Sequence, residues 1–148
     1  RTCLFRSVFL MENPEERKDT MKVAIVGSRE VDLSRLSWLE ALVPKDCTAI
    51  VSGGARGVDQ MAWEIAQRKG ITCIELLPDY GRFGRRAPLI RDREIVKEAD
   101  LVLAVWDGSS RGPRYVMEQC RKTHTPVRVY RPNGTPYLPM EWQEDPFA

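Results

Sequence analysis

The sequence predicts an α/β fold, a Rossmann-like three-layer α/β/α arrangement around a five-stranded parallel sheet. Two observations lead to this prediction. Five short apolar runs alternate with segments of helical periodicity across short connections, a pattern typical of doubly wound α/β proteins. Three of these runs end in loops rich in Gly, Ser, Arg and Asp, and parallel sheets bind ligands beyond the carboxyl ends of their strands.

Each predicted strand is a run of apolar residues bounded by turn signals. The runs cover residues 22–26, 48–51, 71–77, 101–105 and 126–130. Such continuous runs are typical of strands that are buried on both faces. We expect right-handed crossovers and the strand order 3-2-1-4-5, which places a topological switch point between the first and fourth strands.

The predicted helices lie between the strands and begin or end at capping residues. Their expected limits are about 32–43, 58–69, 88–98 and 113–122. Asp32 can cap the first helix, and Gly70 is a good stop signal for the second. Residues 79–86, which carry three arginines and two aromatic residues, are expected to form an irregular loop.

Composition limits the domain organisation and the possible partners. The 148 residues fit one domain, which we place at residues 21–131, with an N-terminal extension at 1–20 and a C-terminal tail at 132–148. The net charge of +2 does not by itself indicate nucleic acid or membrane. No apolar run approaches the ~20 residues of a membrane span, so we expect no membrane contact and a cytoplasmic location.

Metal chemistry has little support in the sequence. The four cysteines show no CxxC or similar spacing, and there is one histidine. Buried free thiols in a reducing compartment are the favoured interpretation for Cys47, Cys73 and Cys120. We therefore predict no metal site and no required cofactor.

The central candidate site follows the second predicted strand. A glycine turn opens the helix at 58–69, so that free backbone N–H groups and the positive helix end converge on one point, which suits a phosphate or carboxylate. A tight turn without a ligand is the alternative. The candidate ligand-binding residues here are Ser52, Gly53, Gly54, Arg56, Gly57 and Asp59.

Two other loops should meet this turn at the carboxyl edge of the sheet. Hydroxyl groups and arginines there can donate to phosphate oxygens, whereas Trp106 either stacks on a base or closes the end of the core. Phosphate affinity is expected from backbone donors together with Arg29 and Arg111. The further candidates are Gly27, Ser28, Arg29, Arg91, Trp106, Asp107, Gly108, Ser109, Ser110, Arg111 and Gly112.

Two common nucleotide motifs are missing. The GxGxxG fingerprint does not follow the first strand, and no Walker GxxxxGK[ST] run is present. The sequence therefore gives little support to the hypothesis that this protein is an ordinary NAD-dependent dehydrogenase or a P-loop NTPase.

The loop motifs resemble the SLOG superfamily, with the YspA/YpsA-related Rossmann-like proteins as the nearest branch. The resemblance rests on residues 27–29, 52–59, 87–92 and 106–112 and covers roughly residues 22–130. It implies binding or sensing of a nucleotide-derived ligand such as ADP-ribose, NAD or AMP. We expect this ligand in the cleft, and we expect a homodimer that forms through a helical face.

Two relatives within the superfamily imply alternative functions. The DNA-processing protein DprA has a very similar SGGARG(I/V)D run, which implies single-stranded DNA binding; the arginines of the loops and of residues 82–86 would then hold the strand, and Tyr80 or Phe83 would stack on bases.

The lonely-guy phosphoribohydrolases have a PGGxGTxxE motif that lines up with residues 107–118 and implies N-glycosidic hydrolysis of a nucleoside monophosphate. Here the motif's glutamate falls on Val116, and Glu118 lies about 200° around the helix. Asp59, Glu75, Asp107 or Glu118 would have to act as the acid or nucleophile, so the catalytic residues stay unassigned.

Overall fold

A five-stranded parallel sheet forms the centre of the computed structural model, which describes residues 20–54 and 57–137. The strands are β1 (Lys22–Gly27), β2 (Ala49–Ser52), β3 (Thr72–Glu75), β4 (Leu101–Val105) and β5 (Val127–Tyr130). Their order is β3-β2-β1-β4-β5, and every neighbouring pair is parallel. The predicted sheet, strand order and switch point between β1 and β4 are therefore confirmed.

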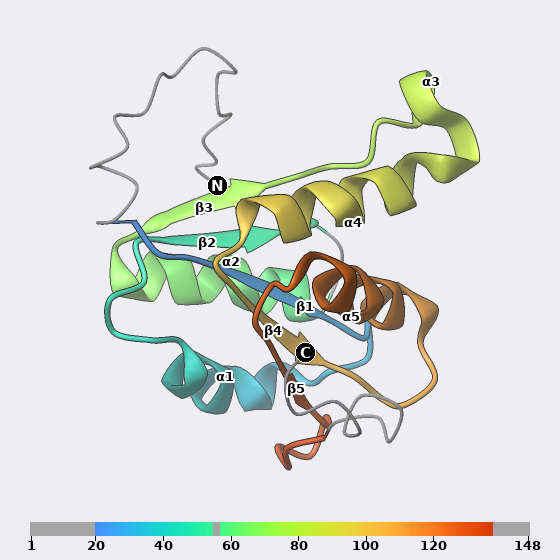
Figure 1. Cartoon of the computed structure of the whole chain (residues 1–148). Coiled ribbons are helices and arrows are strands. Elements are labelled where there is room, and N and C mark those ends of the chain that lie inside the picture. Colours follow the sequence, from blue (N-terminus) through green and yellow to red (C-terminus); the bar gives the residue numbers. More distant parts are fainter. Residues whose placement is uncertain (1–19, 55–56, 138–148) are drawn as a thin grey trace.

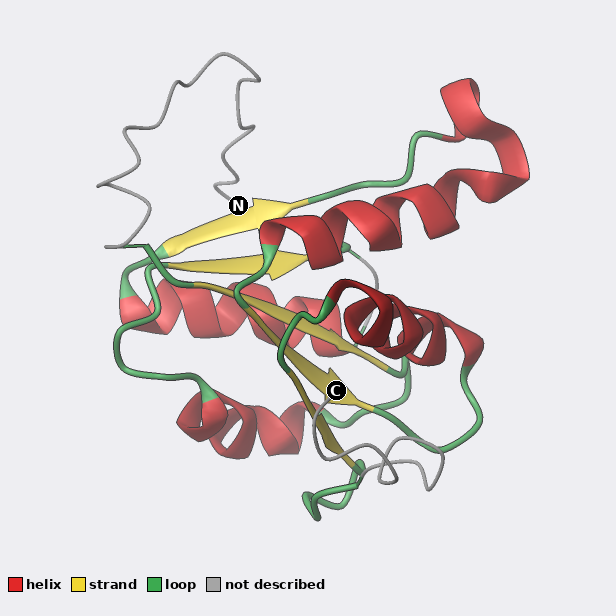
Figure 2. Ribbon diagram, viewed as in Figure 1, coloured by secondary structure: helices red, strands yellow, loops and turns green. Residues whose placement is uncertain are grey.

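Helices cover both faces of the sheet (Figures 1 and 2). They are α1 (Leu36–Leu42), α2 (Val58–Lys69), α3 (Tyr80–Phe83), α4 (Ala87–Glu98) and α5 (Arg111–Thr123), with 3₁₀ turns η2 (Leu33–Arg35) and η3 (Gly84–Arg86). Alternate residues of β1 point to opposite faces. Val23 and Ile25 pack in a core with α1 and α2, whereas Ala24 and Val26 pack in a second core with α4 and α5.

Residues 79–86 correct the predicted irregular loop. Asp79 is the N-cap, and residues 80–86 form α3 and η3 and run directly into α4. The Asp79 carboxylate accepts a hydrogen bond from the Arg82 amide at 3.1 Å, and the Asp79 carbonyl accepts one from the Phe83 amide at 3.0 Å. Asp79 thus caps a helical turn, a signal that the arginines and glycines of this stretch obscured.

Several element limits also differ from the prediction, among them the start of the first helix, where Asp32 caps η2 and α1 begins at Leu36. β3 ends at Glu75, two residues before the predicted end. α5 begins at Arg111 rather than at Pro113. Proline is tolerated there because the first N–H groups of a helix have no intrahelical acceptor. Arg111 and Gly112 therefore belong to the first helical turn and not to a loop.

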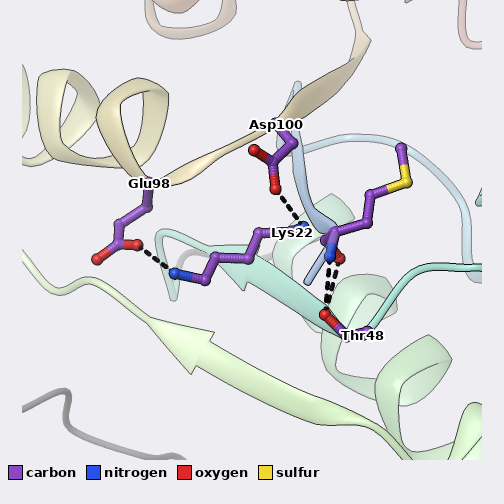
Figure 3. Close-up of polar contacts among 5 residues, drawn as sticks. Lys22, Thr48, Glu98 and Asp100 are labelled. Carbon is purple, nitrogen blue, oxygen red and sulfur yellow. Dashed lines mark hydrogen bonds and ion pairs between the residues drawn. The ribbon is translucent and has the colours of Figure 1, made fainter. Parts of the chain in front are cut away.

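Polar contacts fasten the amino ends of three adjacent strands (Figure 3). The Lys22 amide donates to Asp100 Oδ2 at 2.8 Å, and Lys22 Nζ pairs with Glu98 Oε2 at 3.0 Å. On the other side, the Met21 amide donates to Thr48 Oγ1 at 3.0 Å. These contacts tie the start of β1 to the segments that precede β2 and β4.

The chain after β5 folds back on that strand. An antiparallel bridge joins Tyr130 to Pro136, and the Tyr137 amide donates to the Val129 carbonyl at 2.8 Å. Residues 1–19 and 138–148 lie outside the described residues, so the predicted limits of extension, domain and tail stay predictions. None of the helices described is long and apolar enough to cross a membrane.

Candidate functional site

A cleft of about 550 Å³ opens at the carboxyl edge of the sheet. Its walls come from the loops after β1, β2 and β4, from the first turns of α2 and α5 and from one side of α4, so it lies at the switch point between β1 and β4. Ten of the predicted ligand-binding residues line it: Gly27, Ser28, Arg29, Gly53, Asp59, Arg91, Asp107, Ser110, Arg111 and Gly112.

The other predicted site residues lie elsewhere. Ser52 is fully buried and its hydroxyl accepts a hydrogen bond from the Gly54 amide at 3.2 Å. Gly54 faces the Leu77 side chain, and Gly57 is the residue that precedes α2. The exposed Ser109 does not line the cleft, and Arg56 lies outside the described residues. Trp106 and Gly108 line a second, separate cavity.

Two glycines let the loops approach one another closely. A Cβ atom on Gly27 would lie 2.7 Å from Val58 Cγ2, at the start of α2. A Cβ atom on Gly57, whose φ is +75°, would lie 2.5 Å from the Arg29 carbonyl oxygen. Any larger residue at either position would separate the loop after β1 from the turn after β2. Both glycines therefore shape the cleft, and Gly27 also lines it.

Arg91 holds the turn after β2 against α4. Its Nη1 donates to the Gly53 carbonyl at 2.6 Å, and its Nε pairs with Asp92 Oδ1 at 2.8 Å. Burial raises the pKa of the Asp92 carboxyl, and the adjacent guanidinium opposes that rise. Nε and Nη1 of Arg91 are thus engaged within the protein. Arg91 lines the cleft as predicted, but it acts there as a structural clamp.

The Asp107 carboxylate fills the turn that precedes α5. Its Oδ1 accepts from the amides of Ser109 at 2.8 Å and Ser110 at 2.7 Å, and its Oδ2 accepts from the Ser110 hydroxyl at 2.5 Å. These hydrogen bonds, that of the Ser110 hydroxyl foremost, lower the pKa of Asp107 to about 2. The turn therefore offers a ligand fewer amides than the sequence predicts, because a carboxylate of the chain already occupies two of them.

Arg29 and Arg111 supply the available positive charge. Both are exposed and line the cleft; Arg29 lies in the loop after β1 and Arg111 in the first turn of α5. Within the described part of the chain, neither forms an ion pair. The amides of Arg111 and Gly112 stand at the start of α5, where no intrahelical acceptor exists. Two guanidinium groups and a helix end are the chemistry that binds phosphate.

Sequence reasoning missed several lining residues. Glu30 adds a carboxylate beside Arg29. Pro88, Asp92 and Ile95 recur at three- to four-residue spacing along α4 and form one face of that helix toward the cleft. Their helical spacing relative to Arg91 is the sequence signal that could have identified them.

The lonely-guy alternative lacks its glutamate in this structure. Val116, at the motif position, is buried and lines the cleft. Glu118 is not among the cleft-lining residues and pairs with Arg114 at 3.2 Å on α5. Among the residues described, no group of three or more His, Cys, Asp or Glu side chains is placed to hold a metal ion.

An exposed basic segment projects beyond the carboxyl ends of the strands, as the position of α3 in Figure 1 shows. We call residues 79–86 the basic protrusion. It carries Arg82, Arg85 and Arg86, all exposed. The Tyr80 side chain is 61% exposed and Phe83 is 37% exposed, with the Arg82 guanidinium 5.1 Å from the Phe83 ring centroid. α4 connects the basic protrusion directly to the cleft.

Comparison with known proteins identifies the family. A family model described as DNA recombination-mediator protein A matches residues 7–82, about half of the chain. The search of curated proteins found no match.

Among solved structures, DNA processing protein A from Helicobacter pylori is similar at 24% identity and TM-score 0.62, over 80% of this chain and 68% of that one. Its structure is reported for a single-stranded DNA binding mode.

Two further structures share the fold. DNA processing protein A from Streptococcus pneumoniae is similar at 20% identity and TM-score 0.59, over 76% of this chain and 50% of that one. The structural-genomics target TM1055 is similar at 21% identity and TM-score 0.55, over 72% of each chain. The predicted resemblance to DprA-related proteins is thus confirmed, and the chain belongs to the DNA recombination-mediator protein A family.

Proposed function

We propose that the protein binds single-stranded DNA along the carboxyl edge of its sheet. One observation carries this proposal: exposed arginines that pair with no carboxylate among residues 20–54 and 57–137 lie on that edge, as do exposed aromatic rings. Arg29 and Arg111 line the cleft, and the basic protrusion adds three arginines beside Tyr80 and Phe83. Proteins that bind single strands without sequence preference combine a positive groove with aromatic stacking platforms. The family and the DNA-binding relative from Helicobacter pylori support the proposal.

The charges within the cleft favour a phosphate near its mouth over one deep inside. The Asp107 carboxylate is already satisfied by the turn that follows it, and Asp92 pairs with Arg91. Within the cleft, the exposed cations that can contact DNA are therefore Arg29 and Arg111. We infer that each contacts one backbone phosphate, while bases turn outward toward the aromatic rings of the basic protrusion.

Fluorescence anisotropy with a labelled oligodeoxythymidine tests this proposal. Arg29→Ala and Arg111→Ala should each weaken binding about fivefold, which corresponds to ~1 kcal/mol, and should lower the slope of log K against log salt by about 0.7, the value for one phosphate of a single strand. Arg121→Ala is the matched control, because Arg121 is exposed in the last turn of the same helix, about 15 Å from Arg111.

Equal affinities for the three variants and the wild type would refute the proposed path. So would binding whose affinity does not depend on salt concentration, since phosphate contacts release counterions.

A nucleotide-derived ligand in the cleft is the second candidate function. The volume of about 550 Å³ lies within the range of small-molecule sites. Asp59 and Asp92 line it beside Arg29 and Arg111, so carboxylates for ribose hydroxyls stand near guanidinium groups for phosphate.

Isothermal titration with ADP-ribose, AMP and NAD tests the second candidate. Binding of one of them, with weak dependence on salt and loss in Arg111→Ala, is the expected result. No heat from any of the three ligands would rule it out.

A further inference from the structure

A second cavity lies across one turn from the cleft. Its volume is about 440 Å³. Asp107 lines both hollows, so the turn that begins α5 separates them. The described residues around the second cavity come from this turn and from the segment that folds back after β5. They are Trp106, Asp107, Gly108, Arg131, Pro132, Asn133 and Tyr137.

Two aromatic rings form a fixed floor for this cavity. The ring centroids of Trp106 and Tyr137 are 5.5 Å apart, with an interplanar angle of 51°. Trp106 is buried and its Nε1 donates to the Ser110 carbonyl at 2.9 Å. The backbone of Tyr137 is tied to β5 by its hydrogen bond to the Val129 carbonyl. The floor is therefore held in place before any ligand binds.

The rim supplies a flat cation and an amide. The exposed guanidinium of Arg131 lies over the Tyr137 ring, with Cζ 4.6 Å from the ring centroid. Asn133 Oδ1 accepts from the amide of Thr135 at 3.0 Å and from its hydroxyl at 2.7 Å. These two bonds orient the Asn133 side chain and leave its NH₂ group as the donor for a ligand. Guanidinium planes and aromatic rings stack on unpaired bases, and amides hydrogen-bond to base edges.

We propose that the second cavity holds one unstacked base of the same single strand whose phosphates contact the cleft. This inference rests on the proposed function. The DNA strand can pass over the turn between the two cavities, because the surface at Gly108 is open there: Gly108 is exposed, and a Cβ atom at this position would meet no atom within 4 Å. The base lies at the rim of this cavity and stacks on the open face of the Arg131 guanidinium, whose other face covers the Tyr137 ring.

Substitutions at Arg131 test this site with labelled oligodeoxythymidine. Arg131→Ala should weaken binding at least about fivefold, the lower range for loss of one stacked base. Arg131→Lys should weaken it nearly as much, because lysine keeps the charge but lacks the planar group. Arg128→Ala, an exposed arginine on β5 that lines neither hollow, should leave the affinity unchanged.

The ligand offers an independent test. An oligonucleotide that carries abasic sites should bind wild type and Arg131→Ala equally, since it has no base for the second cavity. The Trp106 indole N–H resonance, assigned by comparison with Trp106→Phe, should shift on addition of the intact oligonucleotide and not on addition of the abasic one.

The outcomes separate this inference from the proposed function. Wild-type protein that binds no oligodeoxythymidine would end both. Binding that depends on Arg29 but is unchanged or tighter in Arg131→Ala would overturn the base site alone. Full affinity in Arg131→Lys would also overturn it, since the contact would then be a charge interaction with phosphate.

Discussion

Gly57→Ala should destabilise the protein strongly, through contacts that the structure defines. Gly57 has φ +75° and ψ −112°, a region that costs residues with a side chain about 1–3 kcal/mol. The new Cβ atom would also lie 2.5 Å from the carbonyl oxygen and 3.0 Å from the carbonyl carbon of Arg29. These are backbone atoms that cannot rotate away, and such overpacking adds about 1–3 kcal/mol. Together these costs are a large part of the ~5–15 kcal/mol by which domains are stable.

Gly84→Ala isolates the contribution of the contact. Gly84 has similar dihedral angles, φ +58° and ψ −133°, but a Cβ atom there would meet nothing within 4 Å. Urea unfolding followed by tryptophan fluorescence should therefore show a free energy of unfolding about 1–3 kcal/mol lower for Gly57→Ala than for Gly84→Ala. Equal losses in the two variants would refute the close approach of the loops after β1 and β2.

Three further predictions follow from the polar contacts and the thiols. Arg91→Met should lower the free energy of unfolding in urea by about 1–3 kcal/mol, because the Gly53 carbonyl and the Asp92 carboxylate lose their partner. NMR titration should show a further rise in the pKa of Asp92, and an unchanged pKa would contradict the clamp. Asp107 has a lowered folded-state pKa of about 2. Its contribution to the free energy of unfolding is therefore complete above the unfolded pKa of about 3.9 and is lost as the pH falls toward 2. Asp107→Asn should flatten the dependence of stability on pH in this range, and a dependence identical to that of the wild type would count against the hydrogen-bonded turn. Burial raises the pKa of Cys120 to about 12. Mass spectrometry should therefore find Cys120 unlabelled by iodoacetamide at pH 8 until the protein is unfolded. Rapid labelling of the native protein would contradict this burial.

Periodicity and glycine placement were enough to predict the sheet. β1 and β4 are continuous apolar runs because helices cover both of their faces. The strand order followed from general rules on crossovers rather than from particular residues. The basic protrusion was harder, because its helical turn depends on one capping carboxylate, Asp79, among residues that favour loops.

The position of the cleft could be predicted, but not the state of its donors. Chemically similar loops at the strand ends had to converge at the switch point. Whether an arginine is free depends on neighbours that are distant in sequence: Arg91 donates to Gly53, 38 residues away. The Asp107 side chain likewise competes for the amides that an anion would use, as aspartates before helices often do. The predicted dimer stays a prediction.

The second cavity could not be found from sequence at all. It depends on Tyr137 returning to Trp106 through a bridge after β5. No periodicity marks that return, and Trp106 alone supported either stacking on a base or closing the core. In the structure Trp106 is buried and lines the second cavity.

A crystal structure with a short oligodeoxythymidine tests the central claim most directly. We expect backbone phosphates within hydrogen-bonding distance of Arg29 and Arg111, at the carboxyl edge of the sheet. A strand bound instead at the amino ends of the strands, around Lys22 and Asp100, would contradict the account, as would a cleft left empty beside DNA bound elsewhere on the protein.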